Sequence, residues 1–317
     1  MSAPNGHLDS EIDAALRGRR VLVTGAAGFI GARLVRALHE RGAEVHGVSR
    51  APQTGDHVRW HAADLAEPEV TSRLVQDVRP QLVYHLASHV SGDRAVGAVM
   101  PTLHDNLLTT VSLLTAACGA GGPRVVLAGS MEECAGDGDD VPGSPYAAAK
   151  TAAGAYGRMF HALYGLPVVN LRIYMVYGPG QRDGSKLIPY VTDCLLRGEH
   201  PRLSSGRREV DWVYVDDVVA ALLAAAQTGP ADGTAVDIGS GEVTTIRSIV
   251  DRLAGLVGGE GRPVYGALDD RPLERRRAAD VRRTRQMLGW EPVTPLDAGL
   301  ARTVEWFRAR RAEAGAI

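Results

Sequence analysis

The sequence is short of the features that mark disulfide-rich, membrane-bound and nucleic-acid-binding proteins. Its three cysteines, Cys118, Cys134 and Cys194, are far apart and odd in number, so neither a disulfide framework nor a zinc knuckle is expected. The first 18 residues lack the apolar run of a signal peptide, and no stretch is long enough to span a bilayer. A net charge of -2 gives no reason to expect a nucleic-acid or membrane partner. These absences predict a protein of the reducing cytoplasm.

The composition is that of a globular protein with an ample core, since 45% of the 317 residues are hydrophobic and 23% are charged. We find no internal repeat, low-complexity tract or linker that would separate an independent domain. Short apolar runs alternate with helical patterns in the N-terminal half, beginning at Arg20–Thr24. This alternation predicts an α/β fold with a parallel, doubly wound sheet. Residues 1–18 are expected to form a tail or a short extra helix.

A glycine-rich turn joins that first strand to a helical pattern ending near Arg41. Its first glycine permits the tight turn, its second lets the backbone approach a pyrophosphate, and its third lets helix and strand pack closely. The helix N-terminus would face the anion. Glycines can serve a tight turn alone, but their place between a strand and a helix favours a dinucleotide site. The residues predicted to contact the dinucleotide here are Gly25, Gly28, Phe29, Ile30 and Gly31.

The end of the second expected strand bears on the choice of dinucleotide. An NAD enzyme usually places a carboxylate there to accept the hydroxyls of the adenosine ribose. This chain has Ser49 and Arg50, and a hydroxyl with a guanidinium could hold a 2′-phosphate. The alternative is a solvated arginine after a strand. The cofactor predicted is therefore NAD(P), with NADP favoured over NAD.

A tyrosine precedes a lysine by four residues in the helix expected after the Gly/Asp-rich loop. This spacing puts the side chains of Tyr146 and Lys150 on one face of the helix. There the ammonium could stabilise a tyrosinate and bring the pKa of the phenol towards neutral pH. Most pairs with this spacing are ordinary contacts on a helix surface. The catalytic interpretation gains weight from the glycine-rich turn far upstream.

The turn TGAAGFIG, the Tyr146–Lys150 pair and the run LRIYMVYGPG at residues 171–180 resemble the extended short-chain dehydrogenase/reductase family. The resemblance is to the epimerase/dehydratase group, which acts mainly on nucleotide sugars, and it extends from about residue 19 to residue 312. It implies transient hydride transfer between a sugar carbon and the nicotinamide. Tyr146 would be the general acid/base, and Lys150 would hold the nicotinamide ribose and lower the pKa of Tyr146.

The resemblance also implies a domain organisation. A Rossmann domain would span residues 19–177, with a returning segment at about 211–240. A smaller C-terminal substrate-binding lobe would be built from residues 178–210 and 241–317 and would close over the carboxyl edge of the sheet. A homodimer is expected through helices placed at 101–117 and 146–164.

Further positions match the cofactor and substrate residues of the family. Asn106 matches an asparagine that organises the active-site end, although a buried capping asparagine is an equally good interpretation. His85 and His89 lack a carboxylate partner at ligand spacing, so no metal site is assigned. The remaining cofactor positions are Asp64, Leu65, Leu86, Ala87, Ser88, Tyr174 and Val176, and His89 is placed at the substrate.

Three polar positions of the family are apolar in this chain. An alignment through Ala135 and Gly136 places Met131 where a serine or threonine hydrogen-bonds the reacting hydroxyl, and a thioether cannot donate. Ser130 or Glu132 could take the role, Tyr146 could act alone, or a one-residue slip in the alignment would restore Ser130.

The other two departures concern the substrate diphosphate. Met175 replaces an asparagine and Val210 replaces an arginine, although Arg207 and Arg208 could substitute for the latter. Arg271 keeps the last phosphate-binding arginine of the family. The three changes together indicate a substrate or binding pose shifted from the family norm.

Two adjacent acids bear on the reaction type. Glu133 matches the catalytic glutamate of the dehydratases, whose work suits a carboxylate with a raised pKa, although Glu132 and Glu133 could equally be solvated loop acids. The sequence favours a nucleotide-sugar epimerase or dehydratase. The alternatives are an NADPH-dependent 4-keto-sugar reductase and, from a different class, a non-catalytic NADP-binding protein.

Overall fold

The computed structural model describes residues 6–134, 140–227 and 229–315, so Ala135 and Gly136 of the aligned motif and the first five residues lie outside it. The chain divides into two compact units. The first unit comprises Met1–Ile173, Val219–Ile238 and Arg282–Trp290, and the second comprises Tyr174–Val218, Gly239–Val281 and Glu291–Ile317.

The first unit is built on a seven-stranded sheet with the order β3-β2-β1-β4-β5-β6-β9, in which all neighbouring strands are parallel. This confirms the predicted doubly wound sheet. The strand order reverses between β1 and β4, and ligands bind beyond the carboxyl ends of the strands at such a point. The strands are β1 (Arg20–Thr24), β2 (Glu44–Ser49), β3 (Arg59–Ala62), β4 (Leu82–His85), β5 (Arg124–Ser130), β6 (Val168–Ile173) and β9 (Ala235–Ile238).

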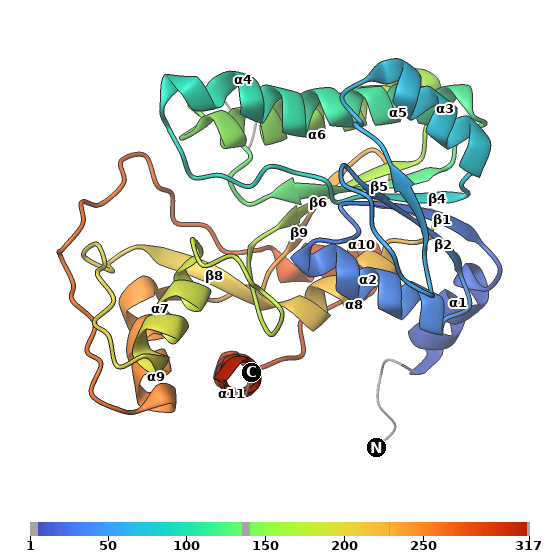
Figure 1. Ribbon diagram of the computed structural model, residues 1–317. Coiled ribbons are helices and arrows are strands. Elements are labelled where there is room, and N and C mark those ends of the chain that lie inside the picture. The colour runs from blue at the N-terminus through green and yellow to red at the C-terminus, as the bar shows by residue number, and fades with distance from the viewer. Residues whose placement is uncertain (1–5, 135–139, 228, 316–317) are drawn as a thin grey trace. The chain divides into compact units, whose positions relative to one another are not determined.

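Helices cover both faces of this sheet, with α3, α5 and α6 on one face and α1, α2 and α10 on the other (Figure 1). Because both faces are covered, the central strands are buried throughout, as β4 is. Leu113 of α5 and Phe160 of α6 belong to one apolar core with Val125 of β5. The helices of this unit are α1 (Gly6–Leu16), α2 (Phe29–Glu40), α3 (Pro68–Val78), α4 (Val99–Thr102), α5 (Thr109–Gly119), α6 (Pro145–Tyr164) and α10 (Val281–Leu288), with a 3₁₀ turn η1 (Val96–Ala98).

The single helix expected at 101–117 is interrupted by a π-helical turn. This turn, η2 (Leu103–Leu108), joins α4 to α5 in one continuous helical stretch. A π turn carries one extra residue per turn and commonly occurs at functional sites. Here it contains Asn106, whose side chain is buried.

The second unit holds a three-stranded sheet in which β8 (Glu209–Tyr214) pairs antiparallel with β10 (Val243–Thr245) and parallel with β7 (Met175–Tyr177). Its helices are α7 (Leu187–Leu196), α9 (Ile246–Val257) and α11 (Leu296–Gly315), and α8 (Val215–Ala224) runs from the second unit into the first. Residues 244–257 have an amphipathic period that predicts a helix, and this prediction was wrong at its start. Residues 243–245 form β10, and the Thr245 hydroxyl caps α9 by accepting from the Ser248 N–H.

Two strand predictions were too long. The sequences at residues 57–63 and 81–87 each predict a strand, whereas the strands observed are limited to Arg59–Ala62 and Leu82–His85. Leu86 to His89 therefore lie in the loop that follows β4. In the described part of the chain, no helix combines the length and the apolar character that crossing a membrane requires.

Candidate active site

The glycine-rich turn between β1 and α2 is shaped by close backbone contacts. Gly25 has a φ of +65°, and a Cβ added there would lie 2.8 Å from both the Ala87 nitrogen and the Leu86 carbonyl carbon. A Cβ on Gly31 would collide with the Gly25 carbonyl oxygen. Gly28 caps α2 and is exposed. At Gly25 and Gly31 any side chain would collide with neighbouring backbone atoms. At Gly28 the lack of a side chain leaves the N-terminus of α2 uncovered.

A buried hydrogen-bonded chain ties β1 and β4 to α5. Thr24 Oγ1 lies 2.9 Å from His85 Nδ1 and accepts from the Ala87 N–H, and His85 Nε2 lies 3.1 Å from Thr110 Oγ1. Because Thr110 donates to the Asn106 carbonyl, this pattern is satisfied when His85 carries its proton on Nε2. Burial, with the charge of Lys150, lowers the pKa of His85 to about 3, so the imidazole is neutral.

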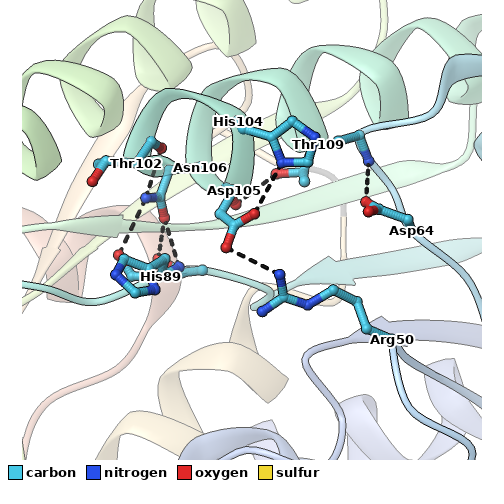
Figure 2. Close-up of polar contacts among 10 residues, drawn as sticks. Arg50, Asp64, His89, Thr102, His104, Asp105, Asn106 and Thr109 are labelled. Carbon is cyan, nitrogen blue, oxygen red and sulfur yellow. Dashed lines mark hydrogen bonds and ion pairs between the residues drawn. The ribbon is translucent and has the colours of Figure 1, made fainter. Parts of the chain in front are cut away.

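Asn106 anchors the loop that follows β4 (Figure 2). Its Oδ1 accepts from the Ser88 hydroxyl at 2.6 Å and from the His89 N–H at 3.0 Å. Its Nδ2 donates to the carbonyl oxygens of His89 and Thr102. Three of these four hydrogen bonds reach the loop after β4, and the fourth reaches the Thr102 carbonyl of the same helical stretch. Asn106 therefore organises the site end of β4 rather than capping a helix.

Tyr146 lies in the first turn of α6, which Ser144 caps by accepting from the Ala147 N–H. The ring is buried, and burial raises the pKa of Tyr146 to about 12. Hydrogen bonds with the Ser130 and Ser88 side chains act in the opposite direction. At neutral pH the phenol of the free protein is thus protonated, and it is held between two hydroxyls.

Lys150 lies one turn further along α6, as the spacing predicts. Its Nζ donates to the Ala128 carbonyl at 2.7 Å and lies 5.9 Å from the centroid of the Tyr146 ring. Burial lowers the pKa of Lys150 to about 8, and the charge of Glu133 works against that shift.

Ser130, at the end of β5, is the hydroxyl beside Tyr146. Besides its hydrogen bond with Tyr146, its Oγ accepts from the Glu132 N–H at 3.2 Å. Met131, which the family alignment places at the Ser/Thr position, is buried and hydrogen-bonds through its N–H to the Ile173 carbonyl.

The two adjacent acids have different surroundings. Glu132 is exposed and accepts from the Ser144 hydroxyl at 3.3 Å. Glu133 is only 3% exposed, and its two oxygens accept from the Ser130 N–H and from Asn170 Nδ2, each at 2.8 Å. The interpretation of two solvated acids is wrong for Glu133.

Arg50, at the end of β2, pairs with an acid that the sequence analysis did not consider. Its Nη1 lies 3.1 Å from Asp105 Oδ2, and the other oxygen of Asp105 lies 3.0 Å from His104 Nδ1 (Figure 2). Ser49 closes β2 and is half-buried. Asp64 accepts from the Ala66 N–H and Leu65 is buried. Asp105 belongs to the π turn and lies 55 residues from Arg50 in the chain.

The second unit carries the positions matched to the substrate diphosphate. Val210 is fully buried in β8, which excludes an arginine there. Arg208 pairs with Glu274 at 3.1 Å, while Arg207 and Arg271 are exposed.

Two hydrogen bonds tie the loops that carry these exposed arginines. The Ser205 N–H and hydroxyl both donate to Asp270 Oδ1, at 3.1 and 2.9 Å. On β7, Met175 and Val176 are half-buried, and the preceding Tyr174 donates its hydroxyl to the Ala278 carbonyl.

Residues 21–239 match the family model described as the NAD dependent epimerase/dehydratase family. The chain belongs to this family. The UDP-glucose 4-epimerase of Mycolicibacterium smegmatis is 33% identical over 312 residues, which cover 91% of this chain and 98% of that protein. The dTDP-glucose 4,6-dehydratase of Streptomyces niveus is 29% identical, with 92% and 94% covered. The solved structure of MoeE5 in complex with UDP-glucose and NAD superposes with a TM-score of 0.81 at 34% identity, covering 92% of this chain and 99% of that one.

For this member of the epimerase/dehydratase family, the first unit brings together side chains that are far apart in the sequence. The Ser88 and Ser130 side chains each act on the Tyr146 phenol, and Lys150 Nζ lies 5.9 Å from the centroid of that ring. Asn170, which holds Glu133, could not be recognised from the sequence, because it lies inside an apolar strand and no local signal marks it.

Proposed function

We propose that this protein is an NAD-dependent epimerase acting on a nucleotide sugar. The observation that carries the proposal is the buried Tyr146 beside the Ser130 hydroxyl, with the Lys150 ammonium one turn away. The similar proteins named above act on or bind UDP-glucose or dTDP-glucose, and we extend a nucleotide-sugar substrate to this chain.

The chain offers a cradle that fits a dinucleotide. Gly25, Gly28 and Gly31 would hold its pyrophosphate at the start of α2, and Lys150 would hold its nicotinamide ribose. When bound, the nicotinamide supplies a carbon that takes and returns hydride and, when oxidised, a positive charge. Tyr146 would first release its phenolic proton to solvent, and the tyrosinate would then take the proton from the sugar hydroxyl and later return it. Ser130 orients that hydroxyl, and the charge of Lys150 favours the tyrosinate that forms.

We favour epimerisation over dehydration because of Glu133. The acid that dehydration needs must reach the leaving hydroxyl, and both oxygens of Glu133 are engaged in the interior. Dehydration through Glu132 is the second candidate, supported by the charge of this exposed side chain, which acts on the pKa of Tyr146.

Product analysis separates the candidates. The protein is incubated with NAD⁺ and either UDP-glucose or dTDP-glucose, and the sugars are followed by NMR and mass spectrometry. An epimerase gives a product of unchanged mass and leaves the cofactor's net oxidation state unchanged, whereas a dehydratase gives a product lighter by one water. A 4-keto-sugar reductase consumes NADPH with a keto sugar. No change of any sugar nucleotide would favour a non-catalytic binder.

Ser130→Ala is expected to lower kcat by about 10²-fold, because Tyr146 loses the hydroxyl that orients the reacting group. Turnover at saturating substrate measures the effect. The double variant Ser130→Ala/Met131→Ser is the informative comparison. It should not regain activity, since Ser130 is the hydroxyl bonded to Tyr146. If the double variant regains activity, the catalytic hydroxyl belongs at position 131 and not at Ser130.

The preference between NAD and NADP depends on the Arg50–Asp105 pair. A 2′-phosphate would have to compete with Asp105 for the guanidinium, so the NADP preference stays a prediction. Asp105→Asn is expected to tighten NADP⁺ binding by up to about 5-fold while changing NAD⁺ binding little, which is the upper range of an exposed ion pair. Fluorescence titration with both dinucleotides measures this, and adding Arg50→Ala should abolish the gain. If the affinities for NAD⁺ and NADP⁺ change equally, Arg50 does not contact the 2′ position of the adenosine ribose.

We propose the second unit as the substrate-binding lobe. Arg207 and Arg271 are its candidate ligands for the diphosphate, since both are exposed and Ser205 and Asp270 join the loops that carry them. His89 of the first unit is exposed and stays a predicted substrate contact.

We further propose a homodimer and a cytoplasmic location. Helices α4 and α6 are packed together in the first unit (Figure 1). Large apolar side chains are exposed along them and η2, as a two-fold helical interface would require. They are Val99, Met100, Leu103, Tyr156, Leu163 and Tyr164. Free thiols at Cys118, Cys134 and Cys194 favour a reducing compartment.

A further inference from the structure

The carboxylate of Glu133 lies in the interior of the first unit, in a space lined by two glycines. A Cβ added to Gly129 of β5 would collide with Glu133 Oε1 and with the Asn170 side-chain oxygen. A Cβ added to Gly154 of α6 would lie 3.1 Å from Glu133 Oε2 and 2.8 Å from Asn170 Nδ2. The carboxylate thus occupies the space between β5 and α6 that two missing side chains leave open.

Lys150 reaches the same place from α6. Gly154 follows it by one helical turn, so both positions lie on the same face of the helix. The Lys150 Nζ donates a hydrogen bond to the carbonyl of Ala128, the residue before Gly129. A buried ammonium and a buried carboxylate are therefore neighbours at the end of β5, and an unpaired charge there would be costly.

We propose that Glu133 is a positioning residue: its carboxylate is the buried counter-charge that keeps Lys150 protonated, and it does not act on the substrate. Asn170 and the Ser130 N–H hold the carboxylate in place, and the same Ser130 presents its hydroxyl to Tyr146. This inference depends on the proposed function only for the role of Lys150 in turnover.

Other charged and titratable groups face this pair. Arg172 of β6 acts on Glu133 but is itself paired with Asp237 at 2.7 Å. His85 of β4 faces Lys150 and is neutral. Burial raises the pKa of Glu133, while the Ser130 N–H, Lys150, Asn170 and Arg172 oppose that rise. Burial likewise lowers the pKa of Lys150 to about 8, and Glu133 opposes that fall.

The direction of the effect follows from these charges. Lys150 carries its proton below its pKa and loses it above. The negative charge of Glu133 opposes the effect of burial on Lys150, so the pKa of Lys150 falls further when that charge is removed. In Glu133→Gln, the midpoint of the Lys150 titration should drop by about one unit or more, as expected on losing an opposite charge at close range.

The sequence makes this titration directly observable, because Lys150 and Lys186 are its only two lysines. Protein labelled with ¹³C-lysine is titrated by NMR, with Lys186, which lies near Asp183 in the second unit, as the internal reference. Glu132→Gln is the matched control for the titration, since it removes the adjacent acid, which is exposed. The proposal expects a lower Lys150 midpoint in Glu133→Gln and little change in Glu132→Gln. An unchanged midpoint in folded Glu133→Gln would overturn it.

The pH profile of kcat/KM supplies the second readout. In Glu133→Gln the loss of activity on the basic side should begin at lower pH, with kcat/KM about tenfold below wild type at high pH and recovering as the pH falls. Activity lost equally at every pH would mean that Glu133 acts on the substrate. If no sugar nucleotide is turned over by the wild type, the proposed function fails while the NMR midpoint still decides this inference.

Glu133→Asp keeps the test valid if the glutamine variant does not fold. The shorter carboxylate retains the charge, so the Lys150 midpoint should stay within a few tenths of a unit of wild type even if thermal stability falls. A midpoint that drops in the aspartate variant by a full unit would contradict the counter-charge role.

Discussion

Replacing Tyr146 with Phe is expected to lower kcat by about 10²–10⁴-fold, because the variant keeps the buried ring and loses the group that exchanges a proton with the sugar. The ring lies in the first turn of α6 and is packed in place, so the fold should tolerate the change. Burial holds the pKa of the free phenol at about 12, so a tyrosinate forms in this protein only with help from neighbouring groups. Steady-state kinetics with the sugar nucleotide identified by product analysis measures the loss.

The matched control for this variant is Tyr164→Phe. Tyr164 lies at the other end of the same helix and is exposed, so removing its hydroxyl should leave kcat within about twofold. NAD⁺ affinity should also be close to wild type in Tyr146→Phe, which separates a lost proton donor from a lost cofactor. Near wild-type turnover in Tyr146→Phe would remove Tyr146 from the mechanism.

Substituting Gly25 with Ala is expected to abolish dinucleotide binding and to destabilise the first unit. A Cβ at a φ of +65° is strained, and it would press on the backbone of Leu86 and Ala87 in the neighbouring loop. Strain of this kind costs about 1–3 kcal/mol before the contacts are counted. Thermal unfolding and titration with NAD⁺ report the two effects separately.

Two further glycine variants make the comparison sharp. In Gly28→Ala the added Cβ would lie 3.1 Å from the Gly25 oxygen, a tight contact but a looser one than those at Gly25, so stability should fall less than in Gly25→Ala while dinucleotide affinity falls. In Gly119→Ala, at the end of α5, no heavy atom lies within 4 Å of the added Cβ, and neither property should change. If Gly25→Ala binds NAD⁺ as tightly as Gly119→Ala does, the turn is not the pyrophosphate site.

Most of the fold could be predicted from local patterns. Buried parallel strands are short apolar runs, as Arg20–Thr24 is, and a helical period follows that strand. Patterns are weakest at the ends of elements, where the apolar period continues beyond the last paired residue. This is why the helix predicted from residue 244 begins with a strand, and why the π turn at 103–108 could not be seen.

The candidate site also has a part that could be predicted from local patterns and a part that could not. The Tyr146–Lys150 pair depends on a spacing within one helix, and a helical spacing can be read in any sequence. Which residue lies beside the Tyr146 hydroxyl depends on how β5 ends. A shift of one residue in the alignment decides between Ser130 and Met131. The sequence analysis left that choice open, and the structure brings Ser130 to Tyr146.

By itself the sequence determined the doubly wound sheet, the family and the paired tyrosine and lysine, because these depend on periodicity and on contacts within a few residues. Only the tertiary structure decided the environments of Glu133 and Arg50. Glu133 is buried against Asn170, which is 37 residues away, and Arg50 is paired with Asp105, which is 55 residues away. Burial and charge pairing set the chemistry of an ionisable side chain, and both arise from segments that meet only when the chain is folded.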